Sequence, residues 1–204
     1  MTTTPTGSPL SRRRAETRER LLEAAIAVFA RIGVDQARVE DISEEAGFTR
    51  GAFYSNFADK DTLIIELLQH QQEMATRVVQ TSIGQVLAGP RPDDFAELVN
   101  AALDAFAENI PADNWMLAEL SLRLAAMRNP LIAEHLDVFE QRQRAVLADI
   151  LKTGLAEIGM RSVLPIDHLV MIALAVHGDF MVRERISSAP TTVTPEERQV
   201  LVSL

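Results

Sequence analysis

The segment VEDISEEAGFTRGAFYSNFADKDTL, residues 39–63, decides the fold of this chain. It contains two short amphipathic helical patterns, expected at about 39–46 and 50–57, on either side of Gly47. Glycine adopts the left-handed backbone conformation that ends a helix and turns the chain sharply. The apolar residues expected to pack the two helices together are Ile42, Ala46, Phe48, Phe53 and Phe57. The segment therefore predicts a helix-turn-helix.

The second of these short helices carries residues suited to a nucleic acid. Gly51 and Ala52 are small enough to let the helix approach a groove closely, and Tyr54 offers a hydroxyl to a phosphate. Lys60, near the start of the next helix, combines a cation with outward-pointing amide donors, which together favour a phosphate. The alternative is a small helix pair without a DNA partner, in which the aromatic residues serve only the core and Lys60 is a solvated charge.

Helical periodicity continues on both sides of this segment and predicts an all-α chain of about nine helices. Apart from the two short helices, the expected helices span about 14–31, 59–83, 93–109, 113–128, 129–158, 165–187 and from 194 onwards. Residues 1–11 are rich in Thr, Pro, Ser and Gly and are expected to form a disordered tail. The expected modules are a DNA-binding domain at 12–62 and a larger helical domain at 63–204.

Composition excludes several classes of protein. The chain has 204 residues and no Cys, so it forms no disulfide, thiolate zinc site or cysteine nucleophile. No apolar run is long enough for a membrane span, and the N-terminus lacks the apolar stretch of a secretory signal, so we expect a soluble cytoplasmic protein. The four His form no metal-binding motif, and the paired acids lie at helix starts. We therefore expect no enzyme activity, cofactor or metal.

The net charge of −9 is unevenly distributed. Residues 1–62 hold nine Lys and Arg against ten Asp and Glu, a net charge of −1, whereas residues 63–204 hold eleven against nineteen, a net charge of −8. The basic end of the first module consists of Arg12, Arg13, Arg14, Arg18 and Arg20. An acidic body with one locally basic end indicates two modules that have different partners.

Residues 14–63 resemble the N-terminal domain of TetR-family transcriptional regulators. The resemblance is carried by AAIAVFARIG at 24–33 and by DISEEAGFTRGAFYSNFADKDTL at 41–63, where order, spacing and residue type all agree. The rest of the chain is similar only as an all-helical pattern of compatible length. The resemblance implies operator contacts at Thr49, Arg50, Ala52, Tyr54, Ser55, Asn56 and Lys60.

Among these positions, Arg50 and Asn56 are the expected base readers, because a guanidinium can fork onto guanine and an amide onto adenine. A phosphate contact is the alternative for Arg50. The family commonly has Ser or Thr where this chain has Arg38, so the cap and phosphate contact of that hydroxyl are in question, although the charge of Arg38 can still reach the DNA backbone. The arm at 12–14 either adds phosphate or minor-groove contacts or is a solvated tail.

For the larger domain, the resemblance implies a small-molecule pocket and a homodimer. The candidate pocket residues are Met74, Phe106, Trp115, Glu119, Leu122, Phe139 and Met171. Trp115 and Glu119 share a helix face, which favours a cationic ligand. The alternatives are an ion pair of Glu119 with Arg123 and, for each apolar candidate, a plain core position.

The candidate dimer residues are His177, Gly178 and Phe180. Gly178 lies inside an apolar helix, where glycine costs about 1 kcal/mol relative to alanine, so close approach by a second backbone is a natural compensation. The alternative is a helix buried within one monomer.

Together these features predict a ligand-responsive repressor, which a small hydrophobic or cationic effector releases from double-stranded operator DNA. A two-fold dimer would present its recognition helices to half-sites roughly 34 Å apart. The alternative is a helical DNA-binding regulator controlled by a protein partner.

Overall fold

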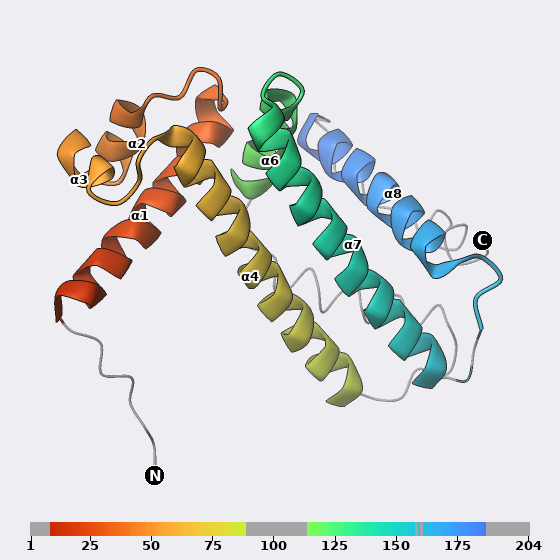
Figure 1. Ribbon diagram of the computed structural model, residues 1–204. Helices are drawn as coiled ribbons and strands as arrows, with labels where there is room; N and C mark the ends of the chain where they lie inside the picture. Colours follow the sequence, from red (N-terminus) through yellow and green to blue (C-terminus); the bar gives the residue numbers. More distant parts are fainter. Residues whose placement is uncertain (1–8, 89–113, 158, 160, 187–204) are drawn as a thin grey trace, which may run out of the picture. The chain divides into compact units, whose positions relative to one another are not determined.

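The computed structural model describes residues 9–88, 114–157, 159 and 161–186. Their regular structure is entirely helical, with no strand in those ranges, which confirms the all-α class (Figure 1). The helices are α1 Pro9–Ile32, α2 Val39–Glu45, α3 Arg50–Tyr54, α4 Lys60–Ala88, α6 Asn114–Ala126, α7 Pro130–Glu157 and α8 Ile166–Ile186. The helices expected at 93–109 and after 194 lie outside the described residues.

Most helix boundaries match the expected ones, and three differ. α1 begins at Pro9, so residues 9–11 are helical and the prediction that they belong to a disordered tail is wrong; proline suits a first helical turn, where no amide donor is needed. α3 ends at Tyr54 and not at 57, because the chain tightens there and the amide of Asn56 donates to the carbonyl of Phe53 at 2.8 Å. α4 continues past its expected end at 83 as far as Ala88, although it contains Gly84, a weak helix former.

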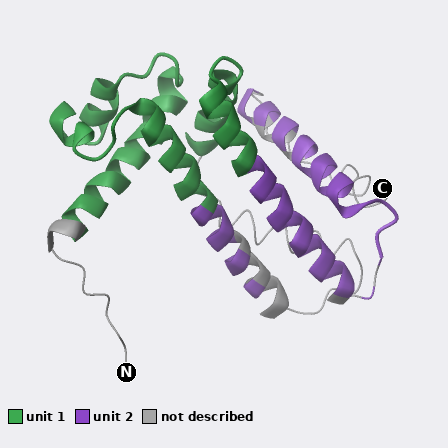
Figure 2. Ribbon diagram, in the orientation of Figure 1, with its two compact units in different colours: residues 1–72, 111–139 green, residues 73–110, 140–204 purple. Residues whose placement is uncertain are grey.

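The chain divides into two compact units (Figure 2). The first comprises residues 1–72 and 111–139, and the second comprises 73–110 and 140–204. The described part of the first unit therefore joins α1, α2, α3 and the start of α4 to α6 and the start of α7. The expected division at 62 and 63 stays a prediction.

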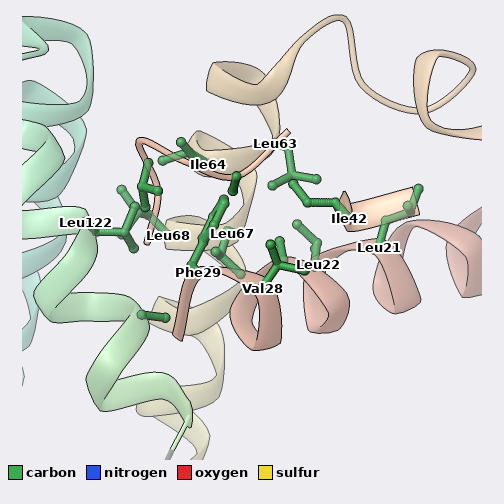
Figure 3. Close-up of a cluster of buried hydrophobic side chains, with 14 of the residues drawn as sticks. Leu21, Leu22, Val28, Phe29, Ile42, Leu63, Ile64, Leu67, Leu68 and Leu122 are labelled. Atoms are coloured by element: carbon green, nitrogen blue, oxygen red, sulfur yellow. The ribbon is translucent and has the colours of Figure 1, made fainter. Parts of the chain in front are cut away.

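The first unit is built around one hydrophobic cluster (Figure 3). Side chains from α1, α2, α4 and α6 meet there and are almost fully buried: Leu21, Leu22, Val28, Phe29, Ile42, Leu63, Ile64, Leu67, Leu68 and Leu122. Complete burial of such a side chain stabilises the fold by about 1.5–3 kcal/mol. The cluster fixes the short helices α2 and α3 against two long ones, and α6 packs directly on α1.

The second unit contains the end of α4, most of α7, and α8. A shallow hollow of about 330 Å³ lies between the end of α7 and the start of α8, lined by Lys152, Leu155, Ala156, Arg161, Ser162, Leu164, Pro165 and Ile166. None of the candidate pocket residues lines it. Over the described ranges, no helix is long and apolar enough to cross a membrane. The same ranges hold no group of three acidic or His side chains that could bind a metal ion.

Candidate nucleic-acid interface

The turn between α2 and α3 has the geometry expected of a helix-turn-helix. Gly47 has φ of +71°, the left-handed conformation predicted for it, and its amide donates to the carbonyl of Glu44 at 3.0 Å. Arg20 of α1 donates to the carbonyl of Ala46 at 2.7 Å, and its guanidinium lies 4.6 Å from the ring centre of Phe48. The turn is therefore fixed by its own backbone and by one cation from α1.

α3 presents one face to the core and the other to solvent. Thr49 caps the helix, because its hydroxyl accepts a hydrogen bond from the amide of Ala52 at 3.2 Å. Phe53 is fully buried, whereas Tyr54 is 47% exposed with its ring edge-on to that of Phe53 at 5.5 Å between centres. Burial of Phe53 thus directs Tyr54 outwards, to the solvent-exposed face of α3.

Arg50, the first residue of α3, is held on that exposed face by two neighbours. Its Nη1 lies 2.8 Å from Oε1 of Glu40 on α2, and its Nη2 donates to the hydroxyl of Tyr54 at 3.4 Å. The hydroxyl of Tyr54 and, after it, the carboxylate of Glu40 raise the pKa of Arg50 above its ordinary value. A permanent cation with a fixed direction therefore stands at the start of α3. The contact with Glu40 was not anticipated from the sequence.

The end of α3 is less open than expected. The hydroxyl of Ser55 donates to the carbonyl of Gly51 at 2.9 Å, and Nδ2 of Asn56 donates to the carbonyl of Ala52 at 2.8 Å. Oδ1 of Asn56 is buried, and within the described part of the chain it has no hydrogen-bond partner. The amide of Asn56 therefore lies against its own helix, and adenine reading by Asn56, which stays a prediction, requires its side chain to rotate.

Two arginines of α1 hold the last carbonyls of this region. Arg14 donates to the carbonyl of Ser55 at 3.2 Å, and Arg18 donates to the carbonyl of Asn56 at 2.6 Å. Arg18 is also paired with Glu66 and lies over the ring of Phe57 at 4.7 Å. These arginines position α3. The signal in the sequence is the four-residue spacing of Arg14 and Arg18, which places both side chains on one helix face.

The start of α4 is capped by Asp59 and tied to the α1–α2 loop by Lys60. Oδ1 of Asp59 accepts from the amide of Thr62 at 2.7 Å and from its hydroxyl at 2.8 Å, and these two bonds lower the pKa of Asp59. Nζ of Lys60 donates to the carbonyls of Val34 and Ala37, both at 2.8 Å. An ammonium has three N–H donors, and two of them are used here. One donor of Lys60 is therefore available for the predicted phosphate contact.

Arg38 occupies the capping position before α2, where the resemblance noted from the sequence implies Ser or Thr. Its backbone amide donates to Oδ2 of Asp41 at 2.7 Å, while its side chain is exposed and makes no capping hydrogen bond. Asp41 therefore supplies an acceptor at this helix start. The DNA contact predicted for Arg38 would come from its charge.

The α1–α2 loop has further partners on α6. The amide of Val34 donates to Oγ of Ser121 at 2.6 Å. Nη1 of Arg128, just after α6, lies 2.7 Å from Oδ2 of Asp35. Together with Lys60, these contacts hold the loop from two different helices. Ser121 was not among the candidates drawn from the sequence, since only its distance in space to Val34 reveals its role.

The candidate pocket residues of the first unit lie in or beside its core. Leu122 and Phe139 are buried, and Trp115 packs on the same cluster with its ring 6.0 Å from that of Phe139. Oε1 of Glu119 accepts from Arg123 at 2.9 Å, so the ion pair named as the alternative is present. A ligand site at these residues stays a prediction.

The other candidates belong to the second unit or lie outside the described residues. Met74 is half-buried on α4, and Met171 is 56% exposed on α8. Phe106 and the side chains of His177 and Phe180 lie outside what is described. Gly178 is exposed, and a Cβ at this position would meet no described atom within 4 Å. The apolar residues Met171, Ile172 and Val176 of α8 are also exposed.

Comparison with known proteins identifies relatives of the N-terminal module. Residues 21–67 match the family described as bacterial regulatory proteins of the tetR family. A protein of Escherichia coli K12, named as a repressor of the acrEF/envCD operon, is 36% identical over 83 residues; the match covers 41% of this chain and 36% of that one. The sequence likeness to that relative therefore spans only about a third of its length.

Solved structures extend the likeness to the whole fold. The fatty acid degradation regulator FadR from Bacillus halodurans has a TM-score of 0.70 at 19% identity and covers 97% of this chain and 96% of its own. A regulator protein from Saccharomonospora viridis, solved in complex with choline, has a TM-score of 0.68 at 20% identity, covering 93% and 95%. At these identities the likeness concerns the fold alone.

Proposed function

We propose that this chain, whose residues 21–67 match the tetR family, is a ligand-responsive transcriptional repressor that binds double-stranded operator DNA as a homodimer. The observation that supports this most directly is the exposed face of α3. Thr49, Arg50 and Tyr54 stand on a helix whose other face is anchored by buried Phe53. A short helix fixed in this way can enter a major groove without loss of its own packing.

Two copies of α3 are needed for useful affinity, because one short helix supplies few base contacts. Two-fold symmetry presents two recognition helices to half-sites about 34 Å apart. We propose α8 as the dimer surface, because its exposed residues include Met171, Ile172 and Val176 and its glycine, Gly178, leaves room for a second backbone. The side chains of His177 and Phe180 are proposed to belong to the same surface.

For the effector, we propose a small hydrophobic or cationic compound that binds near Trp115 and Glu119. A carboxylate beside an indole suits an organic cation, and one regulator of similar fold was solved with choline. Such a ligand would compete with Arg123 for Glu119. Glu119 lies two residues from Ser121, whose hydroxyl accepts from the α1–α2 loop, so displacement of α6 would move that loop. The effector then lowers operator affinity by its preference for the displaced state.

The DNA claim is tested by selecting fragments from a random duplex pool and measuring their affinity by gel shift. We expect Tyr54→Ala and Arg50→Ala to weaken binding at least tenfold, because each removes a group from the exposed face of α3. A matched control is Arg142→Ala, which removes an exposed arginine from the part of α7 in the second unit. Equal binding by the wild type and all three variants would refute the interface.

The effector claim is tested through Trp115, the single tryptophan of the chain. Quenching of its fluorescence by hydrophobic or cationic compounds would support a pocket near Trp115. For the cationic compounds, the quenching should be lost in Glu119→Gln.

A regulator controlled by a protein partner is the second candidate. It is favoured by the exposed apolar side chains of Leu124 and Met127 at the end of α6. Silence of the fluorescence across a broad panel would support this alternative.

A further inference from the structure

Glu40 and Arg50 form an ion pair at the exposed surface of the helix-turn-helix. Arg50 opens α3 and Glu40 lies in the first turn of α2, so the ion pair bridges the two helices of the helix-turn-helix. Both side chains are accessible, with 63% of Arg50 and 44% of Glu40 exposed. A duplex that reaches α3 therefore meets a guanidinium and a carboxylate together.

We infer that Glu40 is a specificity-determining residue that restricts Arg50 to reading a guanine edge and prevents it from acting as a general phosphate clamp. The inference rests on the proposed operator binding. It decides between the two interpretations of Arg50, base or phosphate, that the sequence leaves open.

Glu40 and Tyr54 fix the direction in which the guanidinium of Arg50 points. Of the five N–H donors of a guanidinium, one is engaged by Glu40 and one by Tyr54, so the plane of the group is fixed and three donors stay available. The guanidinium carbon also lies 5.4 Å from the ring centre of Tyr54. An exposed arginine otherwise samples many rotamers, and fixing it before binding lowers the entropy lost in a bidentate contact.

The ion pair of Arg50 and Glu40 has no net charge, so the attraction of Arg50 to a phosphate is largely cancelled. The carboxylate of Glu40 is itself repelled by the DNA backbone. The O6 and N7 acceptors of guanine are neutral atoms that need donors and not net charge. A guanidinium that is held in one direction, within an ion pair that has no net charge, therefore favours guanine over phosphate, which is the condition for sequence discrimination.

The test compares Glu40→Gln with the matched control Glu44→Gln, which removes an equal charge from the same short helix. Each protein is titrated by fluorescence anisotropy with a duplex selected by the wild type and with a scrambled duplex, at two salt concentrations. For Glu40→Gln we expect the ratio of specific to non-specific affinity to fall about tenfold, with scrambled DNA bound more tightly. The salt slope for scrambled DNA should steepen by about one charge, because Arg50 is released to a phosphate.

Two further measurements separate this role from a structural one. Replacing guanine by 7-deazaguanine at the sensitive position removes the N7 acceptor and should weaken the wild type several-fold more than Glu40→Gln. Arg50→Lys keeps the positive charge but loses the two parallel N–H donors of the guanidinium. In this background, the additional change Glu40→Gln should not alter the ratio of specific to non-specific affinity any further.

The outcomes are distinguishable. An unchanged affinity ratio in Glu40→Gln, or an equal fall in Glu44→Gln, overturns the inference while operator binding stands. If the wild type prefers no duplex from the pool, the proposed function fails and the inference with it.

Discussion

The two connections within the helix-turn-helix module are built alike but held by different parts of the chain. The loop at 33–38 joins α1 to α2, and the turn at 46–49 joins α2 to α3. Each contains a glycine with positive φ, +81° at Gly33 and +71° at Gly47, and in each a cation donates to main-chain carbonyls. In the turn at 46–49 that cation is Arg20 of α1, which belongs to the module itself.

The loop at 33–38 is held from outside the three-helix module. Lys60 reaches it from α4, Ser121 from α6 and Arg128 from the turn after α6. The two connections therefore have different roles: the turn at 46–49 fixes the exposed face of α3, which is proposed to read DNA, whereas the loop at 33–38 connects the three-helix module to α6. Changes at the loop should therefore affect stability and effector response together, and changes at the turn should affect stability and DNA binding.

The largest effect is expected from Lys60→Met. The substitution leaves the carbonyls of Val34 and Ala37 without their charged donor, and hydrogen bonds from charged groups are worth about 1.5–3 kcal/mol, so we expect a loss of about 2–3 kcal/mol in the free energy of unfolding. The measurement is urea unfolding followed by circular dichroism. Arg20→Met, the equivalent change at the turn, should cost less because Arg20 is exposed. Equal losses of unfolding free energy in Lys60→Met and Arg20→Met would contradict the expected difference between the loop and the turn.

The features that were predictable from the sequence are those confined to a few neighbouring residues. The left-handed Gly47, the Thr49 cap and the Asp59 cap each join residues at most three positions apart, so a local pattern defines them completely. The outward Tyr54 follows from the burial of Phe53 beside it. All-α architecture likewise follows from periodicity, which is also local.

The contacts that organise the site were not predictable, because they join distant positions. Val34 and Ser121 are 87 positions apart, and Arg18 and Asn56 are 38 apart. Periodicity places each residue on a face of its helix but does not say which face of another helix it meets. For the same reason the sequence predicted a DNA contact by Arg50, to a base or to a phosphate, and did not predict Glu40, on the neighbouring helix, as its partner.

The next effect in size is that of Ser121→Ala. The amide of Val34, a residue that is almost fully buried, loses its acceptor, and an unsatisfied buried donor costs about 1–3 kcal/mol. We expect a loss near 1–2 kcal/mol, together with weaker coupling between effector and DNA. Thr153→Ala removes an exposed hydroxyl that bonds to the carbonyl of Asp149 within α7, away from the DNA-binding candidates, and serves as the control. If both variants respond to effector like the wild type, the loop does not carry the coupling.

Gly47→Ala should lower the free energy of unfolding less than Ser121→Ala does. Its main functional effect should be on DNA binding. Left-handed backbone costs a residue with a Cβ about 1–2 kcal/mol, partly offset by lower entropy of the unfolded chain, so the net cost is about 1 kcal/mol. The new Cβ would lie 3.3 Å from Nη2 of Arg20 and shift the side chain that holds the turn. Gly33→Ala carries the same backbone strain but contacts Ser121 instead.

The two glycine variants therefore have matched backbone costs and different neighbours. We expect similar losses in urea unfolding, but a larger loss of operator affinity for Gly47→Ala and a larger change in effector response for Gly33→Ala. If the two variants change operator affinity and effector response in the same proportion, the turn and the loop are not functionally separate.

Arg128→Ala should have the smallest effect, and its salt dependence makes it the most sensitive test of the loop. The side chains of Arg128 and Asp35 are 71% and 53% exposed, and exposed ion pairs contribute about 0–1 kcal/mol. The difference in unfolding free energy between wild type and variant should shrink towards zero near 1 M salt, where exposed charges are screened beyond about 3 Å. The cost of Ser121→Ala should persist at that salt, because its hydrogen bond joins an amide and a hydroxyl that carry no net charge. A salt-independent cost for Arg128→Ala would mean that its aliphatic stem, and not its charge, packs the end of α6 onto the loop.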